Sequence, residues 1–164
     1  MQERDLSAYK ALRDAMLERH EEAFTSDAAS ERARDASSYR SRLANGETLL
    51  FTLLAWQQGQ LLGALTVERD RRAKVAHQAH LVGMMVGDAA QGRGIGRALL
   101  EQALQQLRAD ERLSLLTLSV TASNAGAVRL YERLGFQRYG RLEGAIRLDD
   151  GRLLDKDLMV LRLR

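Results

Sequence analysis

The stretch QGRGIGRALLEQAL (residues 91–104) decides how the rest of the sequence is interpreted, because three glycines alternate just before a helical pattern. Glycine lets the backbone turn tightly and lets a ligand approach it closely. The first turn of a helix also offers unpaired N–H groups and a partial positive charge. The stretch therefore predicts either a plain strand-to-helix turn or a cradle for an anion, most simply a pyrophosphate.

Two common phosphate-binding motifs do not fit these glycines. A Walker A loop has Lys and then Ser or Thr after its last glycine, but Arg97 and Ala98 follow Gly96. The dinucleotide-binding fingerprint needs a third glycine three positions after the second, where this chain has Arg97. A cradle at this place would therefore be of another kind.

Apolar patterning on both sides of the glycines predicts an α/β fold with a mixed sheet. HQAHLVGMMV (77–86) is typical of a strand, and LSLLTLSV (113–120) predicts another strand after the helix. Further upstream, TLLFTLLAW (48–56) and QLLGALTVE (60–68) flank a turn and predict an antiparallel hairpin.

The remaining segments predict helices first and strands last. Helical spacing covers residues 6–16 and a more polar stretch at 28–43, after which ANGE (44–47) breaks the pattern. A short helix is expected from Asn124 to Leu134, ended by Gly135. The C-terminal residues predict strands joined by a turn at Asp150-Gly151.

Composition limits the class of protein. A chain of 164 residues with 45% hydrophobic content predicts a single domain over residues 1–164. The lack of cysteine excludes disulfides and a cysteine nucleophile and favours a cytoplasmic setting. The longest apolar run, 49–56, is too short to span a membrane. The basic run ERDRRAK (68–74) is interpreted as a solvated loop, so no nucleic-acid partner is expected.

Two motifs carry a resemblance to a known family. Gln91-x-x-Gly94-x-Gly96 after a strand resembles the acetyl-CoA signature of the GNAT superfamily of N-acetyltransferases. NAGAVRLYERLGF (124–136) resembles the family's later helix, which an Asn opens and a Gly-Phe closes, with a Tyr seven residues after the Asn. The order of the other elements also fits, so the resemblance covers nearly the whole chain. One departure is that MQERD (1–5) is too short and charged to supply the family's first strand convincingly, so the presence of that strand stays open.

The resemblance implies a central mixed sheet flanked by helices on both faces, with acetyl-CoA as cosubstrate. The coenzyme would enter where two parallel strands, near Met85 and Leu118, splay apart. Arg93 and Arg97 would add positive charge near the phosphates. The implied binding residues are Met84, Met85 and Val86 for the pantetheine arm, Gln91, Gly92, Arg93, Gly94, Ile95, Gly96 and Arg97 for the pyrophosphate, and Asn124 and Tyr131 from the later helix.

The resemblance also implies the chemistry, which is direct attack of an amine on the thioester. Tyr131 lies where the family places its general acid, and proton transfer from an ordinary phenol to a thiolate costs only about 2 kcal/mol. His80 is a candidate general base, because imidazole titrates in the neutral range; Glu68 and a water relay remain alternatives. No His, Asp and Glu cluster has metal-ligand spacing, so no metal is expected.

The sequence does not identify the acceptor amine. A primary amine of a small molecule, peptide or protein fits the chemistry, and a catalytically silent acyl-CoA-binding module is the alternative. The acidic residues that follow residue 142 are better explained as surface and turn charges than as a site for a cationic amine. His20 and His77 are interpreted as surface residues. Whether the chain forms a homodimer also stays open.

Overall fold

A computed structural model describes residues 1–43 and 49–164 of the chain. It contains one six-stranded mixed sheet in the order β1-β2-β3-β4-β6-β5. The strands are β1 (Leu49–Gln57), β2 (Gln60–Arg69), β3 (Gln78–Val86), β4 (Leu115–Thr121), β5 (Gln137–Arg147) and β6 (Leu153–Arg162). The α-helices are α1 (Leu6–Arg19), α2 (Ala28–Arg32), α3 (Ile95–Ala109) and α4 (Ala125–Arg133), and short 3-10 turns are η1 (Glu3–Asp5), η2 (Glu21–Ala23), η3 (Ala36–Arg42), η4 (Ala73–Val75) and η5 (Asp88–Ala90).

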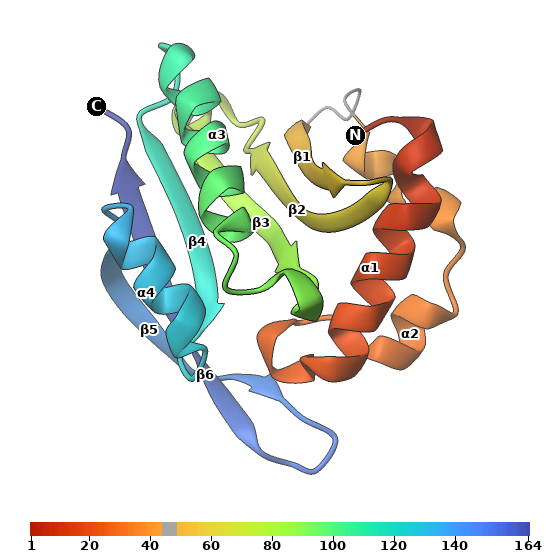
Figure 1. Ribbon diagram of the computed structural model, residues 1–164. Helices are drawn as coiled ribbons and strands as arrows, with labels where there is room; N and C mark the ends of the chain where they lie inside the picture. The colour runs from red at the N-terminus through yellow and green to blue at the C-terminus, as the bar shows by residue number, and fades with distance from the viewer. Residues whose placement is uncertain (44–48) are drawn as a thin grey trace.

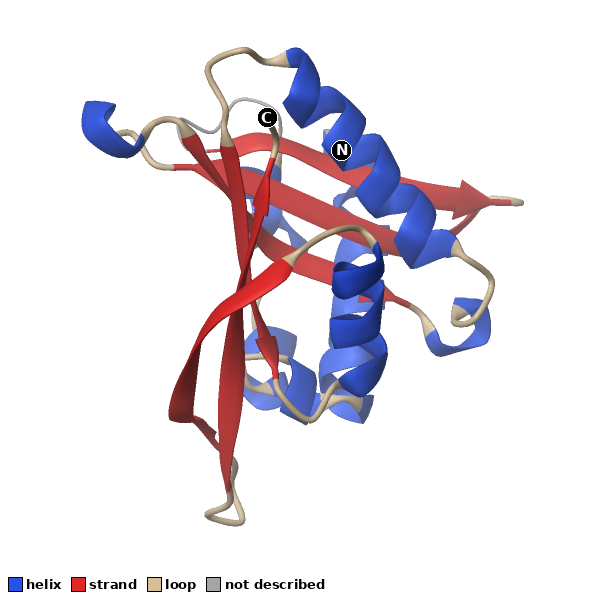
Figure 2. Cartoon of the chain, turned by 90° about the vertical axis from the view of Figure 1, so that its left-hand side faces the viewer, coloured by secondary structure: helices blue, strands red, loops and turns tan. Residues whose placement is uncertain are grey.

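Both predicted hairpins are confirmed. β1 and β2 pair antiparallel around a two-residue turn, in which Gln58 and Gly59 have φ values of 49° and 77°. Two left-handed residues give the turn the twist that a short hairpin requires. β5 and β6 also pair antiparallel, and Gly151 lies in their connection with a φ of 87°. The end of this second hairpin extends beyond the helices in both views (Figures 1 and 2).

The helix expected over residues 28–43 is wrong in part, because the structure divides it. α2 ends at Arg32, and η3 begins after Asp35, whose side chain accepts a hydrogen bond from the Ser37 N–H. An aspartate that caps a new turn favours a helix start over a helix interior, which explains the break. Residues 1–43 contain no strand, which answers for these residues the question that the sequence left open. The predicted break at 44–47 lies outside the described residues.

Helices cover both faces of the sheet, as predicted (Figures 1 and 2). α3 and α4 share a core cluster with Leu65 and Val67 of β2, whereas α1 packs with Ala64 of the same strand. Successive side chains of a strand point to opposite faces, so α1 lies on the face opposite to α3 and α4. The sheet is thus buried on both sides near β2 and β3.

The parallel pair at the centre of the sheet separates partway along. β3 and β4 pair over residues 78–81 and 115–118, and neither strand pairs with the other beyond Leu81 and Leu118, although both are described in full. The β2–β3 register shifts between Thr66 and Val67, which leaves Val82 as an extra residue on β3. Such a bulge bends the strand that carries it. The predicted splay near Met85 and Leu118 is therefore present.

Candidate functional site

A cavity of about 780 Å³ lies at the carboxyl end of β3, between the glycine loop and α4. We call it the coenzyme cavity. Open α/β sheets bind ligands outside the carboxyl ends of their strands, where a crossing of connections leaves a crevice. All but one of the implied coenzyme-binding residues line this cavity, namely Met84, Met85, Val86, Gln91, Gly92, Gly94, Ile95, Gly96, Arg97, Asn124 and Tyr131.

The glycine loop has the backbone geometry of an anion cradle. Gly92 has a φ of 73°, and Gly94, the N-cap of α3, has a φ of 78°. A Cβ atom added at either glycine would meet no atom within 4 Å, so the space in front of the loop is open. A Cβ added at Gly96 would lie only 2.9 Å from the Met84 Cε. The lack of a side chain at Gly96 therefore lets α3 pack closely against β3. The residues therefore fit a bound pyrophosphate, which bare N–H groups at a helix N-terminus would hold.

The two arginines of the loop are placed differently. Arg97 lines the coenzyme cavity, and its Nε donates to the Glu101 Oε1 at 2.8 Å. The Arg93 side chain instead donates to the Gln57 Oε1 of β1, and Arg93 is absent from the lining of the cavity. Of the two arginines in the loop, Arg97 therefore lines the coenzyme cavity and Arg93 does not.

A polar network around His20 contributes to the cavity wall, and the sequence interpretation missed it. His20 lines the cavity, and its Nε2 lies 2.6 Å from the Asp88 Oδ1. Asp88 also accepts from Arg19 at 3.0 Å and from the Gln91 side chain at 3.1 Å. Hydrogen bonds from His20 and then Arg19 lower the pKa of Asp88. His20 therefore ties the end of α1 to the glycine loop, although nothing in its sequence context distinguishes it from a surface histidine.

Tyr131 is buried on α4, with only 6% of its surface exposed. Its ring packs edge-on against Phe136 at 5.6 Å, and its hydroxyl donates to the Met84 Sδ at 3.6 Å. Burial raises the pKa of Tyr131 to about 12. The phenol is thus a protonated donor at neutral pH, directed at the thioether of β3. A thioether is a weak acceptor, so little competes for that proton.

Asn124 has a structural task at the start of α4. Its side-chain oxygen accepts a hydrogen bond from the Ala127 N–H at 3.1 Å. This cap fixes where the helix begins and hence where Tyr131 lies along it. Asn124 also lines the coenzyme cavity, so the residue that caps α4 is at the same time part of the cavity wall.

A second cavity of about 390 Å³ lies along the splay of β3 and β4, and we call it the acceptor cavity. Met84, Asn124 and Tyr131 line both cavities, so the two adjoin at the tyrosine. The His80 Nδ1 lies 2.6 Å from the Thr117 Oγ1 of β4, and both residues line the acceptor cavity. The other walls come from distant segments, including Arg13, Phe24 and Lys156, which no sequence motif singles out.

The carboxylates considered from the sequence lie elsewhere. Glu68 forms an ion pair with Arg42 at 2.9 Å and lines neither of the two cavities. Asp157 is buried and accepts hydrogen bonds from Arg138 and Arg141, which hold its pKa below the usual range, Arg141 most strongly. Glu68 lies across from His80 in the β2–β3 pairing, but neither Glu68 nor Asp157 lines the acceptor cavity.

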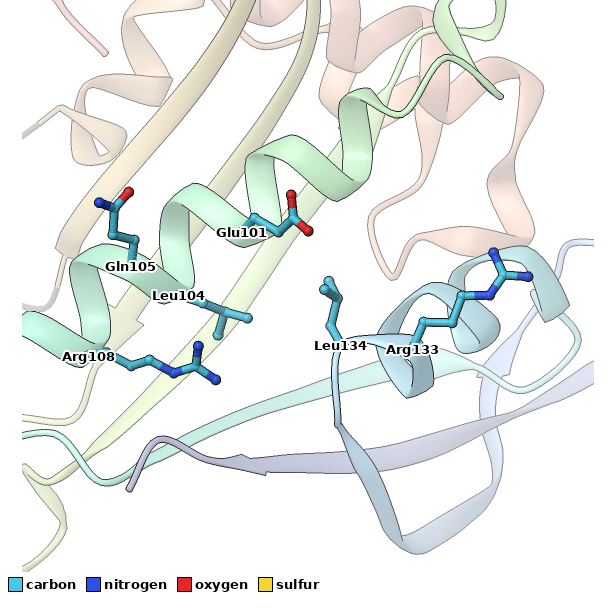
Figure 3. A pocket seen from close by; sticks show the side chains of 6 residues that line it. All are labelled: Glu101, Leu104, Gln105, Arg108, Arg133 and Leu134. Atoms are coloured by element: carbon cyan, nitrogen blue, oxygen red, sulfur yellow. The ribbon is translucent and has the colours of Figure 1, made fainter.

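A shallower hollow of about 500 Å³ lies between α3 and the end of α4. Figure 3 shows its six lining side chains: Glu101, Leu104, Gln105, Arg108, Arg133 and Leu134. Arg133 and Leu134 also line the coenzyme cavity, so the hollow continues that cavity across the surface of α3.

The described residues contain neither a metal-binding cluster nor a helix that could span a membrane. No group of three or more His, Asp or Glu side chains within 1–43 and 49–164 is arranged to hold a metal ion. In the same residues, no helix has the length and apolar character needed to cross a membrane.

Solved structures share this fold over the whole chain. A ribosomal-protein-alanine N-acetyltransferase from Brucella melitensis superposes with a TM-score of 0.84 at 26% identity, covering 99% of this chain and 96% of that one. The protein yncA of Salmonella typhimurium, solved with its cofactor acetyl-CoA, superposes with a TM-score of 0.83 at 22% identity, covering 100% and 91%. At that lower identity the likeness shows the fold alone.

Sequence relatives match shorter stretches. A mycothiol acetyltransferase from Salinispora tropica is 38% identical over 89 residues, which are 54% of this chain and 29% of that protein. The N-alpha-acetyltransferase RimI of Mycobacterium tuberculosis is 37% identical over 83 residues, covering 50% and 49%. The matches thus span between about a third and a half of those relatives' own length. The profile of the acetyltransferase (GNAT) family matches residues 9–136, well over half of the chain, and the protein therefore belongs to that family.

Proposed function

We propose that residues 1–164 act as one domain that transfers the acetyl group of acetyl-CoA to a primary amine. The observation that carries this proposal is the splay of β3 from β4 beside a glycine loop that has open space around Gly92 and Gly94. Family membership and a structural neighbour that contains acetyl-CoA support the choice of coenzyme. The coenzyme supplies an activated acyl group, and no metal is needed for that chemistry.

Each part of the coenzyme has a matching part of this chain. The Gln91 N–H donates to the Asp88 carbonyl at 3.1 Å, so the N–H groups from Gly92 to Arg97 are the proposed donors for the pyrophosphate, in the manner of other helix N-termini. Beyond Leu81, β3 has no partner in β4, so its backbone groups on that side are free to pair with the amides of the pantetheine arm. An N–H on this part of β3, near Met85, is the donor for the thioester oxygen.

Tyr131 is proposed as the general acid. Its hydroxyl, which now donates to the Met84 Sδ, would give its proton to the departing thiolate. With a tyrosine pKa of about 12 against about 8.5 for a thiol, this transfer costs about 5 kcal/mol, more than for an ordinary phenol. That cost fits within the roughly 16 kcal/mol barrier of a step at ~10 per second.

His80 is proposed as the group that receives the proton of the attacking amine. It lines the acceptor cavity, and its bond to Thr117 orients the ring. A water between amine and imidazole would serve the same purpose. Glu68 is the weaker candidate, because Arg42 engages its carboxylate and it lines neither cavity.

The acceptor is proposed to be the amine of a small molecule or of a peptide. Two relatives support this range, one named for mycothiol and one for N-alpha acetylation. The lack of cysteine in the chain is compatible with action in a reducing cytoplasm.

The test is release of free thiol from acetyl-CoA against a panel of amines, with mass spectrometry of the products. We expect an acetylated amine that appears in step with the thiol, and none with the protein omitted. Calorimetric binding of acetyl-CoA without turnover on any amine would favour the silent binding module instead. No binding at all would contradict both.

A further inference from the structure

The charged residues that line the acceptor cavity are basic. Arg13 of α1 and Lys156 of β6 both line it, and none of its lining residues in the described part of the chain is Asp or Glu. Because charges in a desolvated cavity are weakly screened, this wall attracts anionic groups and repels cationic ones.

Lys156 is a cation without a partner. Its ammonium forms no hydrogen bond or ion pair with any residue in 1–43 or 49–164, whereas the neighbouring Asp157 pairs with Arg138 and Arg141. Burial lowers the pKa of Lys156, and no carboxylate acts in the other direction. A partly desolvated and unpaired ammonium costs free energy that an incoming anion would recover.

Arg13 is held in place from several sides. Its Nε donates to the Glu31 Oε2 at 3.0 Å, and its Nη2 donates to the Ser26 Oγ at 3.1 Å. Its guanidinium lies 5.8 Å from the Phe24 ring centre and 5.9 Å from that of Tyr39. These contacts fix the group before a ligand arrives, which lowers the entropy cost of binding.

The buried Glu31 does not cancel this positive charge. Besides Arg13 it pairs with Arg34 at 3.0 Å, and it accepts from the Tyr39 hydroxyl. One carboxylate therefore serves two guanidinium groups, and the cluster keeps a net positive charge. Together with Lys156, Arg13 gives the lining of the acceptor cavity two cationic side chains.

We propose that the acceptor carries an anionic group beside its amine, as a free amino acid carries its carboxylate, and that Lys156 and Arg13 hold that group. The proposal rests on the proposed function, because it assigns the substrate class of the same site. The proposal excludes polyamines as preferred acceptors because they bring further positive charge. It also excludes lysine side chains of proteins because they carry no anionic group beside the amine. The carboxylate would fix the position of the amine between His80 and the thioester.

The first experiment compares acceptors that differ only in the anion. Each of the common L-amino acids is assayed beside its carboxamide, with spermidine and an Nα-acetyl-lysine amide as cationic acceptors, and free thiol is measured. We expect kcat/KM for the best amino acid to exceed that of its amide by about tenfold or more, through KM. Equal values, or a preference for the cationic acceptors, would overturn the proposal while leaving the acetyltransferase activity established. Lack of turnover on every acceptor would contradict the proposed function itself.

The second experiment removes the cation. Lys156→Met keeps the length of the side chain and removes its charge, and Lys156→Arg keeps the charge. Lys74→Met, in an exposed turn, is the matched control. We expect Lys156→Met to raise KM about tenfold for the amino acid and less than twofold for its amide, with KM for acetyl-CoA unchanged. Lys156→Arg should restore most of the difference.

A merely structural role of Lys156 predicts another result. In that case both acceptors would lose activity to the same extent, and the thermal midpoint would fall in Lys156→Met. That outcome contradicts the proposal. We do not vary Arg13, because its removal would leave Glu31 buried with fewer partners and would destabilise the fold.

Discussion

The two cavities on either side of Tyr131 are built in different ways. Nearly half of the residues that line the coenzyme cavity come from one segment, from Met84 at the end of β3 through the glycine loop to Arg97, and the others come from α1, the residues after it and α4. The wall of the acceptor cavity is collected from α1, the segment after it, β3, β4, α4 and β6. The coenzyme wall offers chiefly backbone groups, whereas the acceptor wall offers side chains such as His80 and Lys156.

This difference separates the part of the site that would bind the common coenzyme from the part that would select the acceptor. A backbone cradle needs only glycines and a helix start, so it is retained when most other residues change. A wall of side chains from distant segments can be altered one residue at a time without disturbing the sheet. We therefore expect substitutions in the first cavity to change affinity for acetyl-CoA and substitutions in the second to change the choice of acceptor.

The largest effect is expected at Tyr131, where the two cavities meet. Tyr131→Phe keeps the ring packing against Phe136 and removes the proton, so kcat should fall about 10²-fold or more with KM for acetyl-CoA nearly unchanged. Because the pKa of Tyr131 is about 12, ionisation of the phenol should cost the wild-type protein no activity between pH 7 and 10.

The exposed Tyr139 is the matched control for that substitution. Tyr139→Phe should leave kcat unchanged. A Tyr131→Phe protein with wild-type kcat, measured where chemistry limits the rate, would remove the tyrosine from the mechanism and favour the silent binding module.

The next largest effect is expected at His80 in the acceptor wall. His80→Ala should lower kcat/KM at neutral pH by about 30-fold, less than a full general base contributes, because water can still take the proton. His77→Ala, which alters neither cavity wall, serves as the reference variant. A wild-type kcat/KM in His80→Ala would exclude His80.

A smaller effect is expected at Gly94 in the coenzyme wall. Gly94→Val places a side chain in the open space of the cradle and should weaken acetyl-CoA binding about tenfold or more, which corresponds to about 1.4 kcal/mol. Gly59 has nearly the same φ and equally open surroundings in the β1–β2 turn, so Gly59→Val carries the same backbone strain. Calorimetry that finds equal affinity in both variants would show that the loop does not hold the coenzyme.

The smallest effect separates the two arginines of the loop. Arg97→Gln should raise the Kd for acetyl-CoA about threefold, because an exposed charge near a phosphate is screened by solvent and salt. Arg93→Gln should have no effect, because Arg93 is engaged by Gln57 away from the cavity. Titrations at low salt would show the contrast most clearly, and a larger loss in Arg93→Gln would reverse the assignment.

Most of the fold could be predicted from local patterns. The apolar runs of β1 and β2, the strand before the glycine loop and the helix after it are all encoded in short local segments, and each was found where expected. The helix over 28–43 was not, because helical spacing does not reveal that Asp35 caps a new turn instead of continuing the old one. Prediction fails there because two local preferences compete.

The sequence by itself determined the glycine cradle of the coenzyme cavity, because the cradle is made of neighbouring residues whose backbone geometry follows from glycine and a helix start. The resemblance of residues 124–136 to the family's later helix also pointed to Tyr131. Only the tertiary structure decided the acceptor wall: Arg13 and Lys156 are far apart along the chain, and the packing of α1 against the sheet brings both to one cavity. A side chain's neighbours across such distances depend on how whole elements pack, which no local pattern records.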